Sequence, residues 1–233
     1  MKRFVAAVVV VLGSASVANA QVLNFEGVNA AYPSPPAFIN GFYNGGTSSD
    51  GTTGTNYGIT FSANARATCL NSTSVVCSNA SRGGLGNWNS QRAGLGFADP
   101  NNEPKFMNIA GGFADGFAFM YSAPQFGGSV SIWSGSNGLG SLLATLVLDT
   151  TTPSGCSGYT GLFCPFVPAG VSFLGLARSV TFDVLSEKMV FDDITFGSDV
   201  PFMEPVPEPS TMLLTGTGLL ALGGFVLRCR RKV

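Results

Sequence analysis

Residues 179–197 read SVTFDVLSEKMVFDDITFG and hold the clearest strand pattern in the chain. Val180, Phe182 and Val184 recur at every second position, so in an extended segment they would face the same side. Residues 189–197 are rich in β-branched and aromatic residues and end at a glycine, which is typical of a second strand. This stretch therefore predicts two neighbouring β-strands in the sequence.

Short segments of the same kind recur along the rest of the chain. No amphipathic helix of useful length separates them, and Gly, Ser, Thr and Asn fill the connections. We therefore expect an all-β fold, an antiparallel β-sandwich of jelly-roll type, with an immunoglobulin-like sandwich as the alternative. The connections 40–56 and 78–102 are long for a compact domain. The other predicted strands are 21–25, 57–62, 113–122, 130–134, 142–149 and 171–174.

The N-terminus has the order of a secretory signal. Lys2 and Arg3 precede an apolar run at 4–12, and small residues follow as far as Ala18-Asn19-Ala20. The A-x-A pattern predicts cleavage after Ala20, and the apolar run is too short to cross a bilayer. We expect a signal peptide over 1–20, with a short signal helix that the mature chain lacks.

The C-terminus combines three features in a fixed order. A proline-rich segment at 205–209 is followed by an uncharged apolar run and then by a basic end at 228–233. A helix over 210–227 is long enough to cross a bilayer, and the basic end favours the cytoplasmic side. The sequence therefore predicts a C-terminal transmembrane helix with the body of the protein outside.

The order Val206-Pro207-Glu208-Pro209-Ser210-Thr211, an apolar helix rich in Leu and Gly, and an arginine-rich end resembles the PEP-CTERM sorting signal. The resemblance implies an exosortase-type processing protease of a Gram-negative bacterium as partner. It also implies a transient anchor in the inner membrane, processing near Pro-Glu-Pro, and a final place at the cell surface or in the extracellular matrix. The resemblance further implies that the gene occurs together with genes for extracellular polysaccharide and for biofilm or floc formation.

Charge and histidine content exclude several classes of function. Between residues 21 and 205, six basic residues stand against twelve acidic ones, a net charge near −6. A nucleic-acid partner would favour a basic face, so we expect none. The absence of histidine removes the commonest general base and metal ligand and every Ser-His-Asp arrangement. Chemistry by a carboxylate pair remains open. Its candidate residues are Glu26, Asp99, Glu103, Asp115, Asp183 and Glu187.

Four cysteines bracket two loops of equal length, Cys69 with Cys77 and Cys156 with Cys164. Export to an oxidising compartment makes two local disulfides the simplest pairing, although four cysteines allow three pairings. The spacing is too wide for the usual half-site of a zinc centre.

Acids in the first and last predicted strands form a candidate metal site. Glu26 ends the first strand in NFEG, and Asp192 and Asp193 lie in FDDITFG. These phrases resemble the adjacent first and last strands that hold a structural calcium in many extracellular jelly-roll carbohydrate-binding modules. The resemblance implies a Ca²⁺ ion between them, and carboxylates with loop carbonyls are suitable ligands. Asn44 and Asp50 in the long loop could add oxygens.

Strand alternation puts Asp192 on the side of Val190, Ile194 and Phe196, so we expect it to lean toward the core at a sheet edge. A carboxylate there needs a partner or a metal ion to offset its desolvation. The alternative is that the acids are solvated edge charges that discourage sheet-to-sheet aggregation.

Exposed aromatic rings are candidates for stacking on sugars. Trp88 lies in a loop rich in Gly and Asn (GGLGNWNSQR, 83–92), where either glycan stacking or packing would fit. Trp133 lies in a predicted strand and is expected in the core.

These features predict one β-sandwich domain over 21–198 and a linker over 199–209 before the sorting helix. The expected function is a non-enzymatic, structural or adhesive role among extracellular polysaccharide. A secreted glycan-acting enzyme that uses a carboxylate pair is the alternative.

Overall fold

The computed structural model describes residues 21–29, 36–69, 93–98, 103–151 and 166–202. Regular structure in these ranges consists of strands and one 3-10 turn, η1 (Ser136–Gly138), with no α-helix among them. The strands are β1 (Val22–Leu23), β2 (Ala37–Phe38), β3 (Ile59–Phe61), β4 (Ala65–Cys69), β5 (Ala93–Phe97), β6 (Phe106–Phe113), β7 (Gly116–Ser122), β8 (Gly128–Trp133), β9 (Leu142–Leu148), β10 (Val167–Ser172), β11 (Ala177–Asp183) and β12 (Val190–Phe196).

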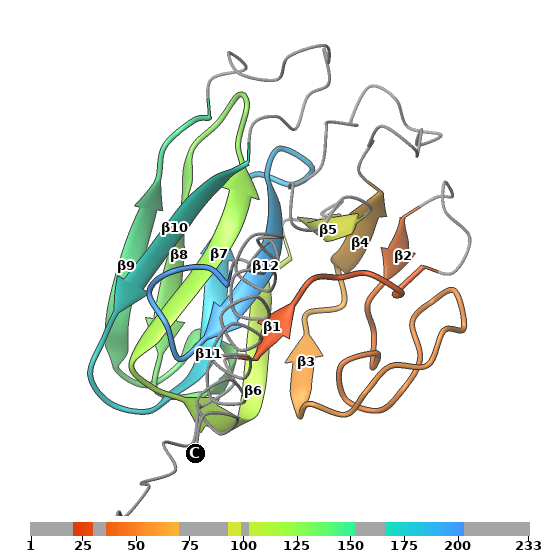
Figure 1. Cartoon of the computed structure of the whole chain (residues 1–233), viewed down its shortest axis with the longest axis horizontal. Helices are drawn as coiled ribbons and strands as arrows, with labels where there is room; N and C mark the ends of the chain where they lie inside the picture. Colours follow the sequence, from red (N-terminus) through yellow and green to blue (C-terminus); the bar gives the residue numbers. More distant parts are fainter. Residues whose placement is uncertain (1–20, 30–35, 70–92, 99–102, 152–165, 203–233) are drawn as a thin grey trace, which may run out of the picture.

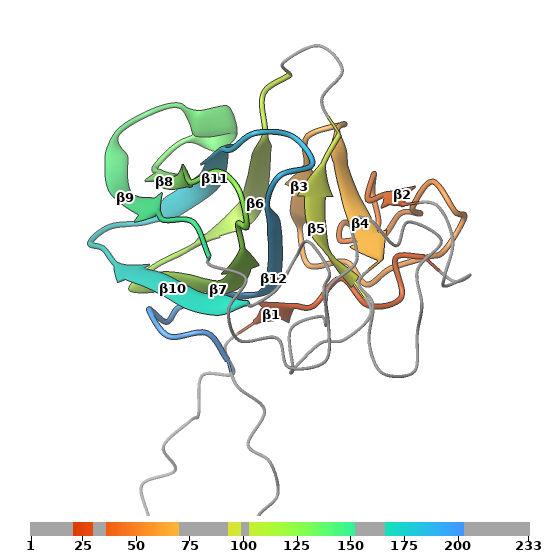
Figure 2. The same ribbon diagram turned by 90° about the horizontal axis from the view of Figure 1, so that it is seen from above.

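The strands form two sheets that face each other (Figure 1 and Figure 2). The seven-stranded sheet has the order β10-β7-β12-β5-β4-β2, with β1 also paired to β12. The five-stranded sheet has the order β3-β6-β11-β8-β9. All strand pairs are antiparallel. The predicted all-β sandwich is confirmed.

Aromatic rings fill the space between the two sheets. Phe191 of β12 packs on Phe182 of β11 with ring centroids 5.0 Å apart, and Phe182 also packs on Phe97 of β5 at 5.1 Å. Such pairs add about 0.5–1.5 kcal/mol each beyond the burial of their surface. Val180 and Val184 are buried in the same core. The predicted common face of Val180, Phe182 and Val184 is therefore confirmed.

The sequence pattern misses four strands, β2, β4, β5 and β6. β5 lies within 78–102, which we expected to be a loop, and all of its residues are buried. Its sequence, AGLGF, has no β-branched residue because it packs closely on β4. A Cβ atom on Gly96 would lie only 2.7 Å from Thr68 Oγ1. The close approach requires small residues, and small residues have low strand propensity. The sequence of β5 therefore does not predict a strand.

Two other segments differ from their prediction. β10 begins at Val167 rather than at 171, and Pro168 fits there because β10 is the last strand of its sheet. The long connection 40–56 is ordered by backbone pairing of Asn44 with Asn56 and of Thr47 with Thr53.

The first and last strands lie side by side, as predicted. β1 pairs with β12 through Val22 with Thr195 and Leu23 with Ile194. β7 pairs along the other side of β12, and β5 meets β12 at Phe191. Because strands flank it on both sides, β12 is an interior strand and not the edge strand that we expected.

Residues 198–202 fold back onto the seven-stranded sheet. Ser172 Oγ donates a hydrogen bond to Asp199 Oδ2 at 2.7 Å, and the Phe202 N–H donates to Thr195 Oγ1 at 2.9 Å. A Cβ atom on Gly170 would overlap the carbonyl oxygen of Asp199. The beginning of the predicted linker therefore packs on the sandwich.

The predicted signal peptide (1–20) and transmembrane helix (210–227) lie outside the described residues. Within the described ranges, no helix has the length and hydropathy needed to span a membrane.

Candidate functional site

Asp192 and Asp193 occupy a β-bulge in β12. The register with β7 shifts between Asp192 and Thr195, and Asp193 has a left-handed φ of 47°. The two acids are 0% and 4% exposed, and the Asp193 N–H donates to Asp192 Oδ1 at 2.8 Å. Phe25, just beyond β1, also has a left-handed φ of 57°. Such non-glycine conformations cost about 1–3 kcal/mol each and cluster at functional sites.

The bulge decides which way these side chains face. Phe191, Ile194 and Phe196 all belong to the core between the sheets, so Asp192 lies on the outer face of its sheet with Val190. The prediction that Asp192 shares a side with Ile194 and Phe196 is wrong, because an inserted residue reverses the alternation beyond it. The alternative of solvated edge charges also fails for Asp192, which is buried in an interior strand.

Glu26 connects the end of β1 to β5. Its Oε1 accepts a hydrogen bond from the Ala93 N–H at 3.0 Å. Over the part of the chain that the structure describes, no three or more His, Cys, Asp or Glu side chains gather closely enough to hold a metal ion. The assignment of Glu26, Asp192 and Asp193 as calcium ligands stays a prediction, and an ion there would need backbone carbonyl ligands as well.

Asn44 and Asp50, which we expected to add oxygen ligands to the calcium site, make contacts within their own loop. Asn44 pairs with Asn56, and the Asp50 N–H donates to Ser48 Oγ at 3.2 Å. These contacts explain why the loop is ordered.

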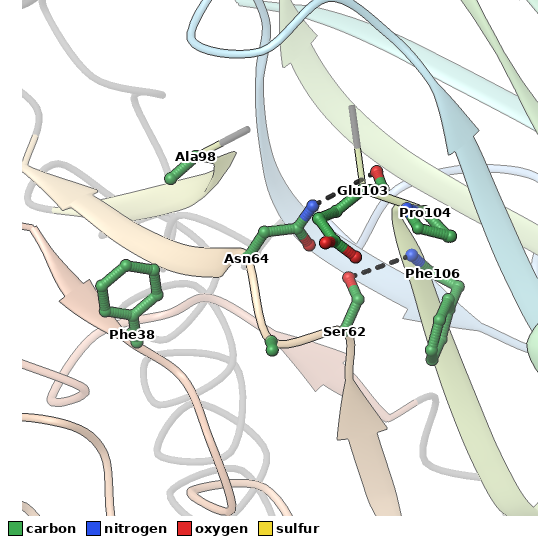
Figure 3. A pocket seen from close by; sticks show the side chains of 8 residues that line it. Phe38, Ser62, Asn64, Ala98, Glu103, Pro104 and Phe106 are labelled. Carbon is green, nitrogen blue, oxygen red and sulfur yellow. Dashed lines mark hydrogen bonds between the residues drawn. The ribbon is translucent and has the colours of Figure 1, made fainter. Parts of the chain in front are cut away.

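A cavity of about 530 Å³ opens between β2, the turn from β3 to β4 and the segment that leads into β6. In Figure 3, Phe38 lies on one side of it and Pro104 and Phe106 lie on the other, with the polar side chains of Asn64 and Glu103 between them. The Phe38 side chain is 38% exposed. The lining residues are Phe38, Ser62, Ala63, Asn64, Ala98, Glu103, Pro104 and Phe106.

Hydrogen bonds hold the polar part of this cavity in place. Ser62 Oγ accepts from the Phe106 N–H at 3.2 Å, and Asn64 Nδ2 donates to the Glu103 carbonyl oxygen at 3.4 Å. Asn64 is only 7% exposed, and its Oδ1 has no hydrogen-bond partner among the described residues. A buried acceptor without a donor costs about 1–3 kcal/mol. This oxygen is itself inaccessible to solvent, so its lack of a partner concerns the interior of the turn and not the open part of the cavity.

A second cavity of about 270 Å³ lies on the other side of the segment 103–106. Glu103 and Asp183 both line it, together with Lys105, Asn137 and Thr181. The structure thus brings together two of the six acids that we considered for a carboxylate pair.

The other candidate acids are placed differently. Glu187 forms a salt bridge with Arg66, which joins the turn before β12 to β4. Asp115 lies in the tight turn between β6 and β7 with a φ of 72°. Asp99 lies outside the described residues.

Trp133 is not a core residue, contrary to prediction. Its neighbour Ile132 points into the core, so the indole lies half-buried on the outer face of the five-stranded sheet. Its Nε1–H donates to Thr181 Oγ1 at 2.9 Å. Alternation within β8 predicts this orientation, whereas the size of tryptophan and its place in a strand alone do not.

Several predicted site residues lie outside the described ranges. They are Trp88, Cys77, Cys156, Cys164, the sorting residues Val206 to Thr211, and Ala18 and Ala20 of the cleavage pattern. Cys69 ends β4 and is disulfide-bonded. Its partner is not among the described residues, so the pairing with Cys77 stays a prediction.

Sequence reasoning did not find the 530 Å³ cavity. Phe38 and Asn64 stand in segments with no motif, and three separate stretches of chain come together only through the pairing of β2 with β4 and of β3 with β6.

Comparison with known proteins gives one match to a family model. Residues 205–232 match the PEP-CTERM protein-sorting motif. The motif marks the chain as an exported protein with a C-terminal sorting signal. No curated protein matches the chain.

Solved structures with a similar arrangement of strands include carbohydrate-binding modules. One, from Cellvibrio mixtus lichenase 5A in complex with cellotriose, has a TM-score of 0.33 and 9% identity over 60% of this chain and 89% of its own. Another, CsCBM6-3 from Clostridium stercorarium in complex with cellobiose, has a TM-score of 0.32 and 17% identity over 59% and 84%. Similarity at this level does not assign a ligand to this chain.

Proposed function

We propose that the mature chain is an exported, non-catalytic β-sandwich that binds extracellular polysaccharide. An exosortase-type protease would process its sorting tail, and the released body would have a structural or adhesive role in exopolysaccharide or biofilm. The sorting motif at 205–232 supports export. The observation that carries the binding role is the cavity between Phe38 and Phe106, with the Glu103 side chain between them.

The chemistry of this cavity suits a sugar. The apolar faces of sugar rings pack on aromatic and proline surfaces, which Phe38, Pro104 and Phe106 supply. Sugar hydroxyl groups donate and accept hydrogen bonds, and they would meet the Glu103 carboxylate. The net charge of the body near −6 favours a neutral or cation-bridged polysaccharide over a strongly acidic one.

Substitution of Phe38 tests the proposal. We expect Phe38→Ala to weaken binding to matrix polysaccharide about tenfold, because loss of one ring–sugar contact removes on the order of 1.4 kcal/mol. Affinity electrophoresis of the mature protein in gels with and without the polysaccharide would measure this change.

Phe126 provides the matched control. It is exposed to a similar degree, 45%, and does not line the cavity. Phe126→Ala should leave the mobility shift unchanged. Equal losses in the two variants, or no retardation of the wild-type protein, would contradict a binding site in this cavity.

We also propose that a structural Ca²⁺ ion binds where β1 meets the bulge of β12. Asp192 and Asp193 are two buried carboxylates in one bulge, and a cation would help to offset the desolvation of their charges. Glu26 would add a third carboxylate. Its Oε1 already accepts the Ala93 N–H, so its other oxygen would bind the ion.

Thermal melting in calcium and in chelator tests the ion. We expect a higher midpoint in calcium, and Asp192→Asn should remove the difference. A chelator shift that survives Asp192→Asn, or no shift in the wild-type protein, would rule out this site. Either result would leave polysaccharide binding in the separate cavity untouched.

A glycan-acting enzyme is the second candidate, because Glu103 and Asp183 line one cavity. A pair of carboxylates can serve as acid and base in glycoside hydrolysis. Release of reducing ends from matrix polysaccharide, lost on both Glu103→Gln and Asp183→Asn, would establish the enzyme. Release of none by the wild-type protein would dismiss it.

A further inference from the structure

One segment of the chain separates the two cavities of the site. Residues 103–106 lead into β6, and Glu103, Pro104 and Phe106 line both the cavity of about 530 Å³ and the cavity of about 270 Å³. Surfaces that share side chains are no farther apart than the width of those side chains. The two cavities therefore meet along this segment and do not lie at unrelated places on the molecule.

Hydrogen bonds fix this segment from both sides. The Glu103 carbonyl oxygen accepts from Asn64 Nδ2 in the turn between β3 and β4 at 3.4 Å. On the other side, the Lys105 carbonyl oxygen accepts from the Phe182 N–H of β11 at 2.9 Å. The wall that the cavities share is thus held by the fold itself, so a ligand would not have to order it. Binding to a preformed surface loses less conformational entropy.

The volumes of the cavities indicate that they act together. Ligand sites in proteins usually occupy about 300–1,000 Å³. The larger cavity, at about 530 Å³, falls within this range, whereas the smaller one, at about 270 Å³, lies below it. The smaller cavity is therefore better explained as an extension of the larger one than as a separate site.

The smaller cavity adds polar walls to the mainly apolar walls of the larger one. Contacts outside the cavity hold two of its side chains in place. Trp133 Nε1–H donates to Thr181 Oγ1 at 2.9 Å, and Asn108 Nδ2 donates to Asn137 Oδ1 at 2.7 Å. Fixed donors and acceptors of this kind suit the hydroxyl groups of a sugar. The polar side chains found only in the smaller cavity are Lys105, Asn137, Thr181 and Asp183.

From these observations we propose that one linear polysaccharide chain fills both cavities and crosses the segment 103–106, so that neighbouring sugar units lie on its Phe38 side and on its Asp183 side. This inference rests on the proposed polysaccharide binding and deepens it. The site recognises a run of several sugar units, and a short fragment fills only part of it. Glu103 and Asp183 outnumber Lys105 along the run, so like-charge repulsion disfavours an acidic sugar unit here.

The dependence of affinity on chain length tests whether the two cavities form one site. The probes are fragments of the matrix polysaccharide, from disaccharides to octasaccharides, made by partial acid hydrolysis and separated by size. Isothermal titration calorimetry with the full chain in detergent micelles would give Kd for each length. We expect Kd to fall on the order of tenfold or more from the disaccharide to the octasaccharide, because the second cavity is then filled by a unit already attached to the first.

Substitution of Asp183 separates the two cavities, because Asp183 lines the smaller one and not the larger. We expect Asp183→Ala to weaken octasaccharide binding about tenfold, the effect of one lost hydrogen bond to a charged group, and to leave disaccharide binding unchanged. Phe38→Ala should weaken binding of both lengths. Asp149→Ala is the matched control, because Asp149 is also exposed, lines neither cavity and carries the same charge.

Two results would overturn the extended site and leave the proposed function standing, provided that Phe38→Ala still weakens binding. They are equal affinity for all fragment lengths, and equal octasaccharide binding by Asp183→Ala and Asp149→Ala. If neither the fragments nor the whole polysaccharide bind the wild-type protein, the proposed function fails and the extended site fails with it. If Asp183→Ala does not fold, the dependence on fragment length in the wild-type protein decides alone.

Discussion

Tyr121 in β7 combines burial, a neighbouring carboxylate and one hydrogen bond. Its hydroxyl donates to the carbonyl oxygen of Asp149 at 3.2 Å. Burial raises the pKa of Tyr121 above the ordinary value of 10.0, and the charge of Asp149 raises it further. The folded protein therefore keeps this proton at a pH where the unfolded chain has begun to lose it.

This shift predicts the direction of a pH effect. The stabilising contribution of Tyr121 is complete below pH 10 and is lost as pH rises through the higher pKa of the folded state, because the unfolded state then binds fewer protons. Tyr121→Phe should lower the free energy of unfolding by about 1 kcal/mol at neutral pH through the lost hydrogen bond. Urea titrations at several pH values would show a weaker decline above pH 10 in the variant. If the free energy of unfolding declines equally above pH 10 in both proteins, groups other than Tyr121 cause the decline.

Single residues also mark where prediction from sequence ends. Asp192 and Asp193 could be identified as unusual because acids rarely occur inside an apolar strand. Their orientation could not be predicted, because a bulge inserts a residue without leaving a motif. Phe38 and Asn64 gave no signal, since what they share is a cavity formed by contacts between distant segments.

Strands differ in how clearly their sequences predict them. β11 and β12 carry alternating β-branched and aromatic residues and were predicted within two residues at each end. β5 and β4 consist mainly of alanine, glycine and other small residues, because they pack closely together. Their strand conformation is determined by pairing with neighbours rather than by propensity, so a single sequence does not show it.

The segment after β12 gives a prediction for an element. Gly170 of β10 leaves room for the Asp199 carbonyl, and a methyl group there would overlap this oxygen and approach Ala118 Cβ at 2.9 Å. We expect Gly170→Ala to lower the free energy of unfolding by about 1–3 kcal/mol, the usual cost of overpacking. The midpoint of urea denaturation measures this loss.

Gly111 of β6 is the control for this substitution. A Cβ atom there would meet no atom within 4 Å, and its φ is not left-handed. Gly111→Ala should change stability by less than about 0.5 kcal/mol. Equal midpoints for the two variants would mean that residues 198–202 do not pack on the sheet as described.

The whole molecule combines a C-terminal sorting motif with a β-sandwich of two open sheets. Pairing of β1 with β12 brings the first described strand beside the last one, and residues 198–202 then lead toward the sorting motif at 205–232. Export and fold class could be read from the sequence because both depend on local order and periodicity. The two cavities required the three-dimensional arrangement, since they depend on which strands are neighbours.

The most direct test of polysaccharide binding as the function is the distribution of the protein in a culture that makes matrix. Immunoblots of cell, matrix and medium fractions would be compared for the wild-type protein, Phe38→Ala and Phe126→Ala. We expect all three to be exported and processed alike, with the wild-type protein and Phe126→Ala retained in the matrix and Phe38→Ala shifted to the medium. Equal retention of Phe38→Ala in the matrix would contradict the proposed role of the cavity.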